Sequence, residues 1–305
     1  MRLGFNIPHM GPPASADNIV RVAKKAEELG YETLWVTERL LFPASPRSPY
    51  PATPDGSLPD VYKNVIDPIA SLTFVAARTS KIGLGTSVLD SPYYNPVMLA
   101  RSLTALDVLS NGRLRLGMGL GWSEDEYEAS GAPMTQKGKR ADEFIAVLKA
   151  VWTKEPAEFQ GEFYKLAKST VLKPVQKPHP PIYLAAYSPG AMKRVATLAN
   201  GWLPAGIPLP AMKEMWDGIK GMAQQAGRNP DDLDMIVRAN LMITDSPLGD
   251  DRFPFMGSPD QIKSDIQTCR DMGAVEVGFD PAFEDVGQTV DGFLQRMEQM
   301  RELAG

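Results

Sequence analysis

The sequence predicts a closed (β/α)₈ barrel formed by a single domain that spans residues 1–305. Short apolar runs rich in β-branched residues alternate with longer helical patterns, as in βα units that build a parallel sheet. Eight such runs can be counted, and the chain length fits a barrel with insertions. An open doubly wound sheet is the alternative. That fold usually has a glycine-rich phosphate turn after its first strand, and this position reads NIPHMGPP.

The first two units occupy the amino-terminal part of the chain. The apolar run at 2–7 is typical of a strand, and residues 17–29 place apolar side chains on one helical face. Gly30 ends that helix, and TLWV at 33–36 is a compact second strand. Residues 41–66 are rich in proline, lack periodicity and are too long for a βα connection. We therefore expect a surface excursion over one end of the barrel, of the kind that often forms a lid.

Units three and four give the clearest pattern. A helix over 67–79 precedes the strand 81–89, and four leucines along one side predict a helix over 95–109. In RLRLGM at 113–118, apolar residues alternate with Arg or Gly, as expected of the fourth strand. The segment 119–138, rich in Gly and acidic residues, forms a second insertion.

A helix and a small hairpin precede the fifth strand. The helix over 139–152 has an apolar core face, and aromatic runs on both sides of a turn-forming pair predict a hairpin at 157–166. The remaining units alternate strand and helix up to an amphipathic tail. They comprise strands 181–186, 201–204, 234–243 and 274–279, and helices 190–199, 210–226, one that starts at Gly257–Ser258, and 287–303.

Composition and charge exclude several classes of function. The formal net charge of −5, without a cluster of Lys and Arg, argues against a nucleic-acid or anionic-membrane surface. The single cysteine, Cys269, excludes an intramolecular disulfide and a cysteine-based zinc site. The two histidines, His9 and His179, are far apart in sequence, so no metal site is expected. The amino terminus lacks a secretory pattern and no run approaches the roughly 20 apolar residues of a membrane span, so we expect a cytoplasmic protein.

One uninterrupted block resembles a known family. The residues IGLGTSVLDSPYYNPVMLARSLTALDVLSNGRLRLGMGLGWSEDEY at 82–127 are similar to the third and fourth units of the bacterial luciferase-like monooxygenase superfamily. The resemblance spans nearly the whole chain and favours the branch that depends on the deazaflavin coenzyme F420. It implies a flavin-type coenzyme at the carboxyl ends of the strands. It also implies a cis peptide at Ser87–Val88, with Thr86, Ser87 and Val88 against the coenzyme ring.

A second similar segment is LAAYSPGAMKRV at 184–195. Ser188 is expected to cap a helix whose free N–H groups and partial positive charge can hold a phosphate. The resemblance implies that the coenzyme phosphate lies against Ala186, Tyr187 and Ser188. The alternative is that Ser188 is an ordinary helix cap without a ligand.

The third feature is Thr37-Glu38-Arg39 at the end of the second strand, where family members often have Asp followed by His. Glu38 can accept a hydrogen bond from the coenzyme ring, and Arg39 can stabilise negative charge that develops on the ring or on a substrate oxygen. The alternative is a solvent-exposed ion pair at a strand end.

Three further residues are candidates for the site. His9 follows the first strand, and an ordinary imidazole pKa of about 6.5 suits proton transfer. Trp122 stands where the sugar-phosphate dehydrogenases of the family carry a catalytic glutamate. That difference argues against a glucose-6-phosphate type of activity and predicts an aromatic wall against an apolar substrate or the ring. Asp125 stands where some relatives use an Asn to reach the coenzyme.

These features lead to three hypotheses of function. The first is an F420-dependent oxidoreductase that transfers a hydride to or from a small organic substrate, and the run AAYSP at 185–189 favours it. The second is an FMN-dependent monooxygenase that uses O₂ and takes reduced flavin from a separate reductase. The third is a barrel that binds flavin without catalysis. By analogy with relatives, we also expect a homodimer, and the loop PYYNP at 92–96 can serve packing, a subunit contact or a ligand.

Overall fold

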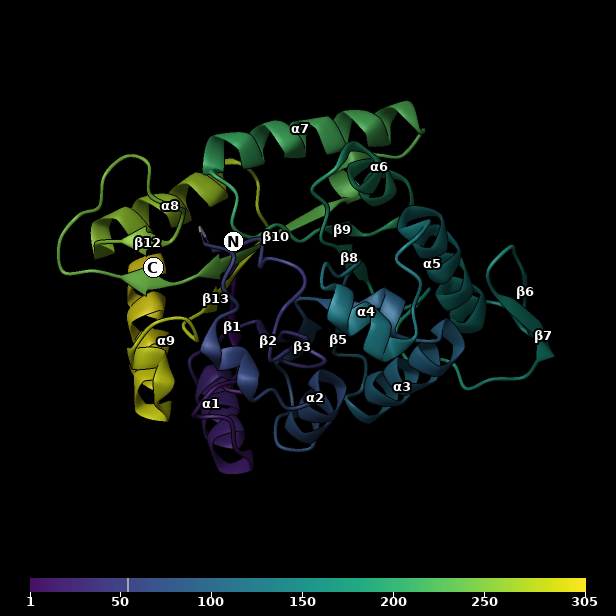
Figure 1. Cartoon of the computed structure of the whole chain (residues 1–305), viewed down its shortest axis with the longest axis horizontal. Coiled ribbons are helices and arrows are strands. Elements are labelled where there is room, and N and C mark those ends of the chain that lie inside the picture. The colour runs from purple at the N-terminus through teal and green to yellow at the C-terminus, as the bar shows by residue number, and fades with distance from the viewer. Residues whose placement is uncertain (54) are drawn as a thin grey trace.

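Eight parallel strands close into a barrel in the computed structural model, which describes residues 1–53 and 55–305 (Figure 1). Neighbouring strands pair in the order β3-β2-β1-β13-β10-β9-β8-β5, and β5 pairs with β3 to close the circle. The prediction of a closed barrel is therefore confirmed. The barrel strands are β1 (Arg2–Asn6), β2 (Thr33–Val36), β3 (Gly83–Thr86), β5 (Leu114–Gly119), β8 (Ile182–Leu184), β9 (Gly201–Trp202), β10 (Asp234–Asn240) and β13 (Glu276–Asp280).

Helices surround the barrel (Figure 1). Each predicted helix is present, and several begin where the sequence offers a cap followed by proline, as at Ser188-Pro189 and Ser258-Pro259. The short helix α4 (Glu124–Ser130), inside the second insertion, was not predicted. The other helices are α1 (Ala16–Glu28), α2 (Pro68–Ala76), α3 (Pro96–Leu109), α5 (Lys137–Thr153), α6 (Pro189–Leu198), α7 (Leu209–Gln225), α8 (Pro259–Asp271) and α9 (Val290–Ala304).

The insertions lie where the sequence predicts them. The described part of segment 41–66 has little regular structure apart from a short 3₁₀ turn, η1 (Asp60–Lys63). The predicted hairpin is formed by β6 (Ala157–Gln160) and β7 (Lys165–Ser169), which pair antiparallel. The expected strand 234–243 is divided, because its last residues form β11 (Met242–Ile243) and pair with β12 (Met256–Gly257) outside the barrel.

The interior of the barrel is filled by one large ring. Trp35 packs with Tyr183, Leu203 and Ile236 as a small cluster inside the barrel, separate from the larger core between strands and helices. A Cβ atom at Gly85 would lie 2.3 Å from the Trp35 ring, so only glycine leaves room for it there. The indole Nε1 of Trp35 donates to the buried Glu276 carboxylate at 2.8 Å.

Glu276 also closes the amino-terminal end of the barrel, since its carboxylate accepts from Arg115 at 2.7 Å and from Thr33 at 3.1 Å. Ligands of such barrels bind at the opposite end, where the carboxyl ends of the strands form an opening that we call the mouth.

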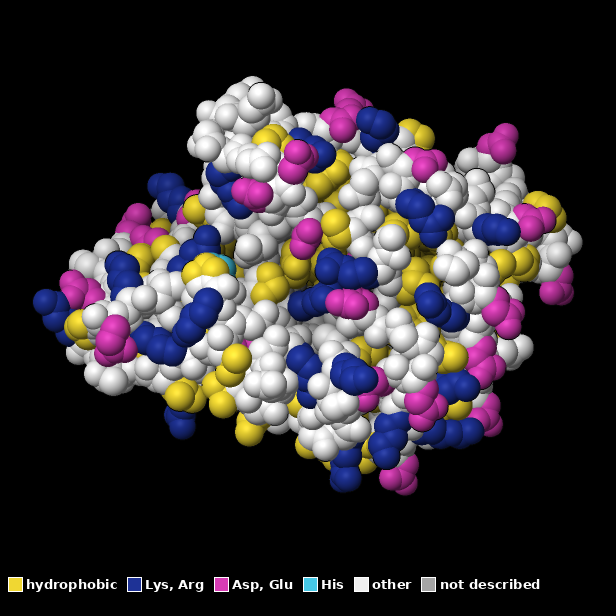
Figure 2. Space-filling view, turned by 180° about the vertical axis from the view of Figure 1, so that it is seen from behind, with side chains coloured by type: hydrophobic (Ala, Val, Ile, Leu, Met, Phe, Trp, Pro, Cys, Tyr) yellow, Lys and Arg dark blue, Asp and Glu magenta, His cyan; other side chains and the backbone are white. Residues whose placement is uncertain are grey.

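The surface combines charges of both signs. On the face shown in Figure 2, Lys and Arg side chains are interspersed with Asp and Glu side chains. Among the described residues, no helix is long and apolar enough to cross a membrane. Cys269 is buried and unpaired.

Candidate active site at the carboxyl ends of the strands

The third strand bends at the mouth. The peptide bond Ser87–Val88 is cis, as the resemblance implies, and the chain resumes as β4 (Leu89–Asp90). The Val88 side chain packs against the Trp35 cluster. The Ser87 carbonyl accepts from Arg238 at 2.7 Å, whereas the buried Ser87 hydroxyl has no hydrogen-bond partner within the described chain. The bend therefore presents an unused hydroxyl group in the wall of the mouth.

Thr86 has a different environment. Its hydroxyl donates to the Gly117 carbonyl at 2.8 Å and accepts from the Gly117 N–H at 3.0 Å, so it links β3 to β5. A contact between Thr86 and a coenzyme stays a prediction, because this hydroxyl is already satisfied by the backbone.

A buried polar network that the sequence analysis did not identify crosses the mouth. Arg238 on β10 forms an ion pair with Asp280 on β13 at 2.5 Å, and Asn6 on β1 donates to the same carboxylate at 2.8 Å. Burial disfavours the charge on Arg238, but Asp280 outweighs this and raises the pKa of the guanidinium. The sequence held a signal for this network, since Asp280 directly follows the apolar run of the eighth strand.

His9 lies below this network and is fully buried. Its Nδ1 lies 3.0 Å from the Ile7 carbonyl, and its Nε2 lies 2.8 Å from the carbonyl and 3.0 Å from the nitrogen of Thr37. Burial lowers the pKa of His9, which favours the neutral ring. Both ring nitrogens face the backbone and join the ends of the first two strands. Proton transfer by His9 therefore stays a prediction that needs these contacts to open.

Glu38 and Arg39 are both buried at the mouth, and they do not pair with each other. The Glu38 carboxylate accepts from the Asp90 N–H at 2.5 Å and from the Tyr94 hydroxyl. Burial, together with the nearby Asp90 carboxylate, raises the pKa of Glu38 to about 8. The raised pKa favours the protonated form of Glu38 near neutral pH. The loop at 92–96 serves packing through this Tyr94 contact.

Arg39 instead pairs with Glu126 on α4 at 2.6 Å and lies 3.9 Å from Asp90. Glu126 is also buried and accepts from the Leu40 N–H at 2.7 Å. Burial raises the pKa of Asp90 to about 6, although Arg39 opposes this shift. The guanidinium of Arg39 is thus neutralised by carboxylates that helix α4 and the third strand supply.

Four aromatic side chains extend across the mouth, and we call them the aromatic row. Trp122 follows β5, Tyr50 and Tyr62 come from segment 41–66, and Phe283 follows β13. Successive ring centroids lie 5.5, 5.8 and 5.9 Å apart. The guanidinium carbon of Arg39 lies 5.0 Å from the Trp122 ring and 5.5 Å from the Tyr62 ring. Trp122 is therefore part of a row of aromatic side chains, and its contact with a substrate or the coenzyme ring stays a prediction.

Asp125 faces segment 41–66. Its carboxylate accepts from the Arg47 N–H at 3.0 Å and from the Arg47 guanidinium at 2.7 Å, and Glu128 binds the same guanidinium at 2.6 Å. These contacts fasten the segment to helix α4. A contact between Asp125 and a coenzyme stays a prediction.

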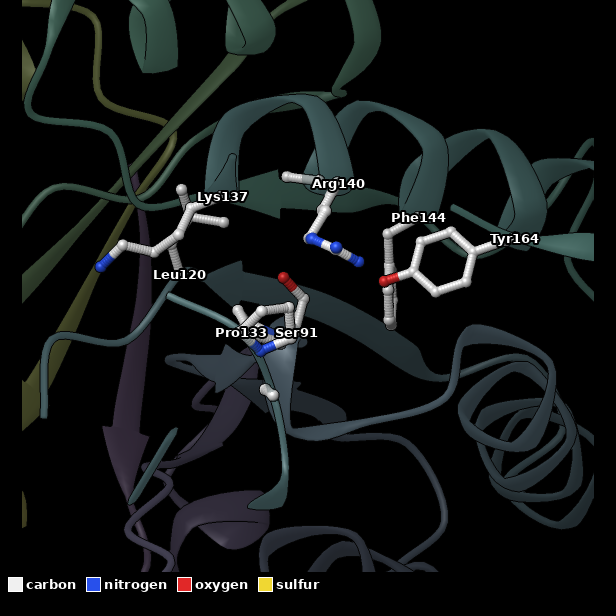
Figure 3. Close-up of a pocket in the computed structure, with 10 residues that line it drawn as sticks. Ser91, Leu120, Pro133, Lys137, Arg140, Phe144 and Tyr164 are labelled. Carbon is white, nitrogen blue, oxygen red and sulfur yellow. The ribbon is translucent and has the colours of Figure 1, made fainter. Parts of the chain in front are cut away.

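A small, open pocket adjoins the mouth at the amino-terminal end of α5, and we call it the α5 groove (Figure 3). Figure 3 shows the Arg140 guanidinium, the Ser91 hydroxyl and the Tyr164 hydroxyl turned toward the same space. The lining residues are Ser91, Pro92, Leu120, Ala132, Pro133, Lys137, Arg140, Ala141, Phe144 and Tyr164.

The cations of the α5 groove lack acidic partners. Within residues 1–53 and 55–305, neither Lys137 nor Arg140 forms an ion pair or a side-chain hydrogen bond, and the Arg140 Nε is buried without a partner. The two cations instead lie over aromatic rings, Lys137 at 4.9 Å from the Tyr127 ring centroid and Arg140 at 4.3 Å from that of Phe163. The first turn of α5 has no side-chain cap, so its N–H groups are free as well. Hairpin β6–β7 contributes Tyr164, and Glu143 holds the hairpin turn by accepting from three backbone N–H groups. This combination of charge and free N–H groups suits an anion.

The turn predicted to hold phosphate lies beside the groove. An adjoining pocket shares Ser91, Leu120 and Ala141 with the groove and reaches Ala185 and Ala191. Ser188 caps α6, as predicted, by accepting from the Ala191 N–H at 3.4 Å.

The neighbours of Ser188 differ in exposure. Ala186 is buried and its carbonyl accepts from Trp202 at 3.0 Å, whereas Tyr187 is 56% exposed. The roles of Ala186, Tyr187 and Ser188 toward a ligand stay predictions. Among the described residues, no group of three His, Cys, Asp or Glu side chains is arranged to hold a metal ion.

Comparison with known proteins agrees with this geometry. The model of the luciferase-like monooxygenase family matches residues 1–248. An uncharacterized protein of Mycobacterium tuberculosis (strain ATCC 25618 / H37Rv) is 36% identical over 203 residues, which cover 64% of this chain and 72% of that protein. The F420-dependent glucose-6-phosphate dehydrogenase of Amycolatopsis mediterranei (strain U-32) is 28% identical over 244 residues, 76% of this chain and 68% of that enzyme.

A solved structure shows the same fold. The monooxygenase RslO1 from Streptomyces bottropensis superposes with a TM-score of 0.80 at 21% identity, covering 99% of this chain and 98% of that one. The family match covers most of the chain, and the closed barrel agrees with it. The chain therefore belongs to the luciferase-like monooxygenase family.

Proposed function

We propose that the protein is an oxidoreductase that uses coenzyme F420. The observation that carries this proposal is the division of charge between the α5 groove and the mouth. In the described chain, Lys137 and Arg140 of the groove contact aromatic rings and have no carboxylate partner, whereas the cations of the mouth, Arg39 and Arg238, are paired with carboxylates. A flavin-type coenzyme has the matching form, a flat ring that is joined to an anionic tail.

The residues fit such a ligand at both ends. At the mouth, the unused Ser87 hydroxyl can hydrogen-bond a heteroatom of the ring, and Val88 can pack against its face. In the groove, Arg140, Ser91 and Tyr164 can bind a phosphate, and the adjoining pocket reaches Ala185 and Ala191, which flank the turn at 186–188. Arg–phosphate hydrogen bonds are charge-assisted and favour a fixed geometry.

Two observations favour F420 over FMN. The F420-dependent relative is similar over 76% of this chain, and the run AAYSP at 185–189 resembles the deazaflavin branch. When bound, the coenzyme would supply two-electron chemistry in the form of a hydride transfer.

The chain's own residues would shield and orient the reactants. The aromatic row excludes water from the mouth, and segment 41–66 is fastened over it by Arg47. Glu38, with a pKa of about 8, holds a proton close to the ring site and can donate a hydrogen bond at neutral pH. Arg39 stays next to two carboxylates, which leaves little net charge in its vicinity.

The experiment is retention of coenzyme. The protein is incubated separately with oxidised F420 and with FMN, desalted, and examined by ultraviolet–visible absorbance. We expect the F420 spectrum to remain with the protein. Retention of FMN alone would instead favour the monooxygenase that receives reduced flavin from a reductase, and retention of neither would contradict both proposals.

A further inference from the structure

We infer that the mouth takes a neutral, largely apolar substrate and discriminates against anionic substrates. This inference rests on the proposed function, because it assumes that the coenzyme tail occupies the α5 groove. It names the class of molecule that the coenzyme would oxidise or reduce, which the comparisons leave open.

The first argument is that the mouth offers no free cation in the described part of the chain. Arg39 is only 5% exposed and pairs with Glu126 at 2.6 Å, with Asp90 as a second neighbour. Arg238 is 11% exposed and pairs with Asp280 at 2.5 Å. A substrate phosphate or carboxylate would need a cation that is not already neutralised, since burying an unpaired charge is unfavourable.

The second argument concerns the balance of positive and negative groups in the mouth. Glu126, Asp90 and Asp280 are buried carboxyl groups beside only two guanidinium groups, so an incoming anion meets no excess of positive charge. The unpaired cations lie in the α5 groove, at Lys137 and Arg140, where the coenzyme phosphate would take them.

The third argument is the surface that remains for a substrate. The aromatic row presents partly exposed rings at Trp122, Tyr50 and Phe283. The buried Tyr62 joins Tyr50 and Phe283 edge to face, and Trp122 packs against Tyr50 at a tilt. Aromatic side chains give large apolar contact areas with little loss of conformational entropy. A flat or chain-like apolar molecule fits this wall. A phosphorylated sugar does not.

The test compares two probes that differ by one charge, acetophenone and para-acetylbenzoate. Their dissociation constants are measured by equilibrium dialysis at pH 7 without coenzyme, so that the result does not depend on which coenzyme binds. Inorganic phosphate is present throughout to occupy the cations of the α5 groove, so that the carboxylate probe reports on the mouth alone. We expect acetophenone to bind at least about tenfold more tightly than para-acetylbenzoate.

Two matched variants on helix α4 locate the effect. Glu126→Gln frees Arg39 from its nearest partner, so the preference for the neutral probe should fall at least about fivefold. Glu124→Gln removes the same charge from an exposed position on the same helix and should leave the preference unchanged. Because Glu126→Gln alters a buried pair, its folding is checked by circular dichroism.

A second pair of variants tests the wall if Glu126→Gln does not fold. Trp122→Ala should weaken acetophenone binding at least about fivefold, and Trp122→Phe should restore most of it. Equal or tighter binding of para-acetylbenzoate to the unmodified protein, no binding of either probe, or an unchanged preference in folded Glu126→Gln overturns the inference. Coenzyme retention without probe preference would refute this inference alone, whereas probe preference without retention would refute the proposed function alone.

Discussion

The mouth of the barrel and the α5 groove adjoin each other, since Asp90 borders the mouth and Ser91 lines the groove. The two regions differ in whether their cations are paired with carboxylates. In the mouth, Arg39 and Arg238 are buried and paired with carboxylates. In the groove, Lys137 and Arg140 lack such partners in the described chain. Paired, buried charges contribute to the folded structure, whereas unpaired cations beside a pocket are available to a ligand.

The largest expected effect concerns the buried carboxyl groups of the mouth. The pKa of Glu38 is raised to about 8 by burial and by Asp90, so the folded protein holds this proton more tightly than the unfolded chain does. This contribution to stability is complete at low pH and is lost as the pH rises from about 5 to 8. Glu38→Gln mimics the protonated group and removes the dependence.

The variant should therefore gain roughly 4 kcal/mol relative to the unmodified protein between pH 5 and pH 9. Urea denaturation at several pH values measures this difference. Glu128→Gln, an exposed glutamate, serves as the control and should follow the unmodified protein. Parallel stability curves for Glu38→Gln and the unmodified protein would show that Glu38 is not a buried acid.

The second prediction compares one arginine from each region. Arg39→Met leaves Glu126 buried without its partner, so the free energy of unfolding should fall by about 3 kcal/mol. Arg140→Met removes an unpaired cation and should change it by less than about 0.5 kcal/mol. Urea denaturation of both variants gives the values, and equal losses would contradict the comparison between the two regions.

The third prediction concerns the affinity for the coenzyme instead of the stability of the fold. Arg140→Met should weaken the affinity for F420 by about 30-fold, because a charge-assisted hydrogen bond contributes about 2 kcal/mol. Absorbance titration measures the dissociation constant. Lys139→Met, on the same turn but exposed, is the matched control. A deazaflavin without the phosphate tail should bind both variants and the unmodified protein with the same affinity. If Arg140→Met weakened the binding of this ligand as much as that of F420, Arg140 would contact the ring instead.

The smallest effect is expected at the edge of the mouth. Arg47 fastens segment 41–66 to Asp125 and Glu128, but it is 47% exposed, so its ion pairs contribute at most about 1 kcal/mol. Arg47→Met should speed release of the bound coenzyme about two- to threefold in stopped-flow experiments. High salt should also speed coenzyme release from the unmodified protein, but it should change the release rate of the variant little. Lys63→Met, which removes another exposed ion pair within the segment, should leave the release rate unchanged.

Much of the site's framework could be predicted from the sequence. The eight strands, the hairpin and the capped start of α6 depend on local periodicity and on turn or cap residues, which neighbouring positions reveal. The bend at Ser87–Val88 was found through family resemblance. Trp122 lies among aromatic side chains, but its neighbour Tyr50 was not identified, and its contact with a substrate or ring stays a prediction.

Other features of the site could not be derived in this way. Helix α4 was missed because its short acidic sequence lacks an apolar stripe, and so was its Glu126, which lies 87 positions after Arg39. The sequence analysis considered an exposed ion pair at Glu38 and Arg39. In the structure these residues are buried and face different partners, Tyr94 and Glu126.

By itself, the sequence determined the order of strands and helices, the closed barrel and the family, because each depends on patterns that neighbouring residues carry. Only the tertiary structure decided which cations are neutralised and which remain available. Charge pairing depends on distances of a few ångströms between side chains that are far apart in the chain, as for Arg238 and Asp280. The functional difference between the mouth and the α5 groove therefore arises from folding and not from composition.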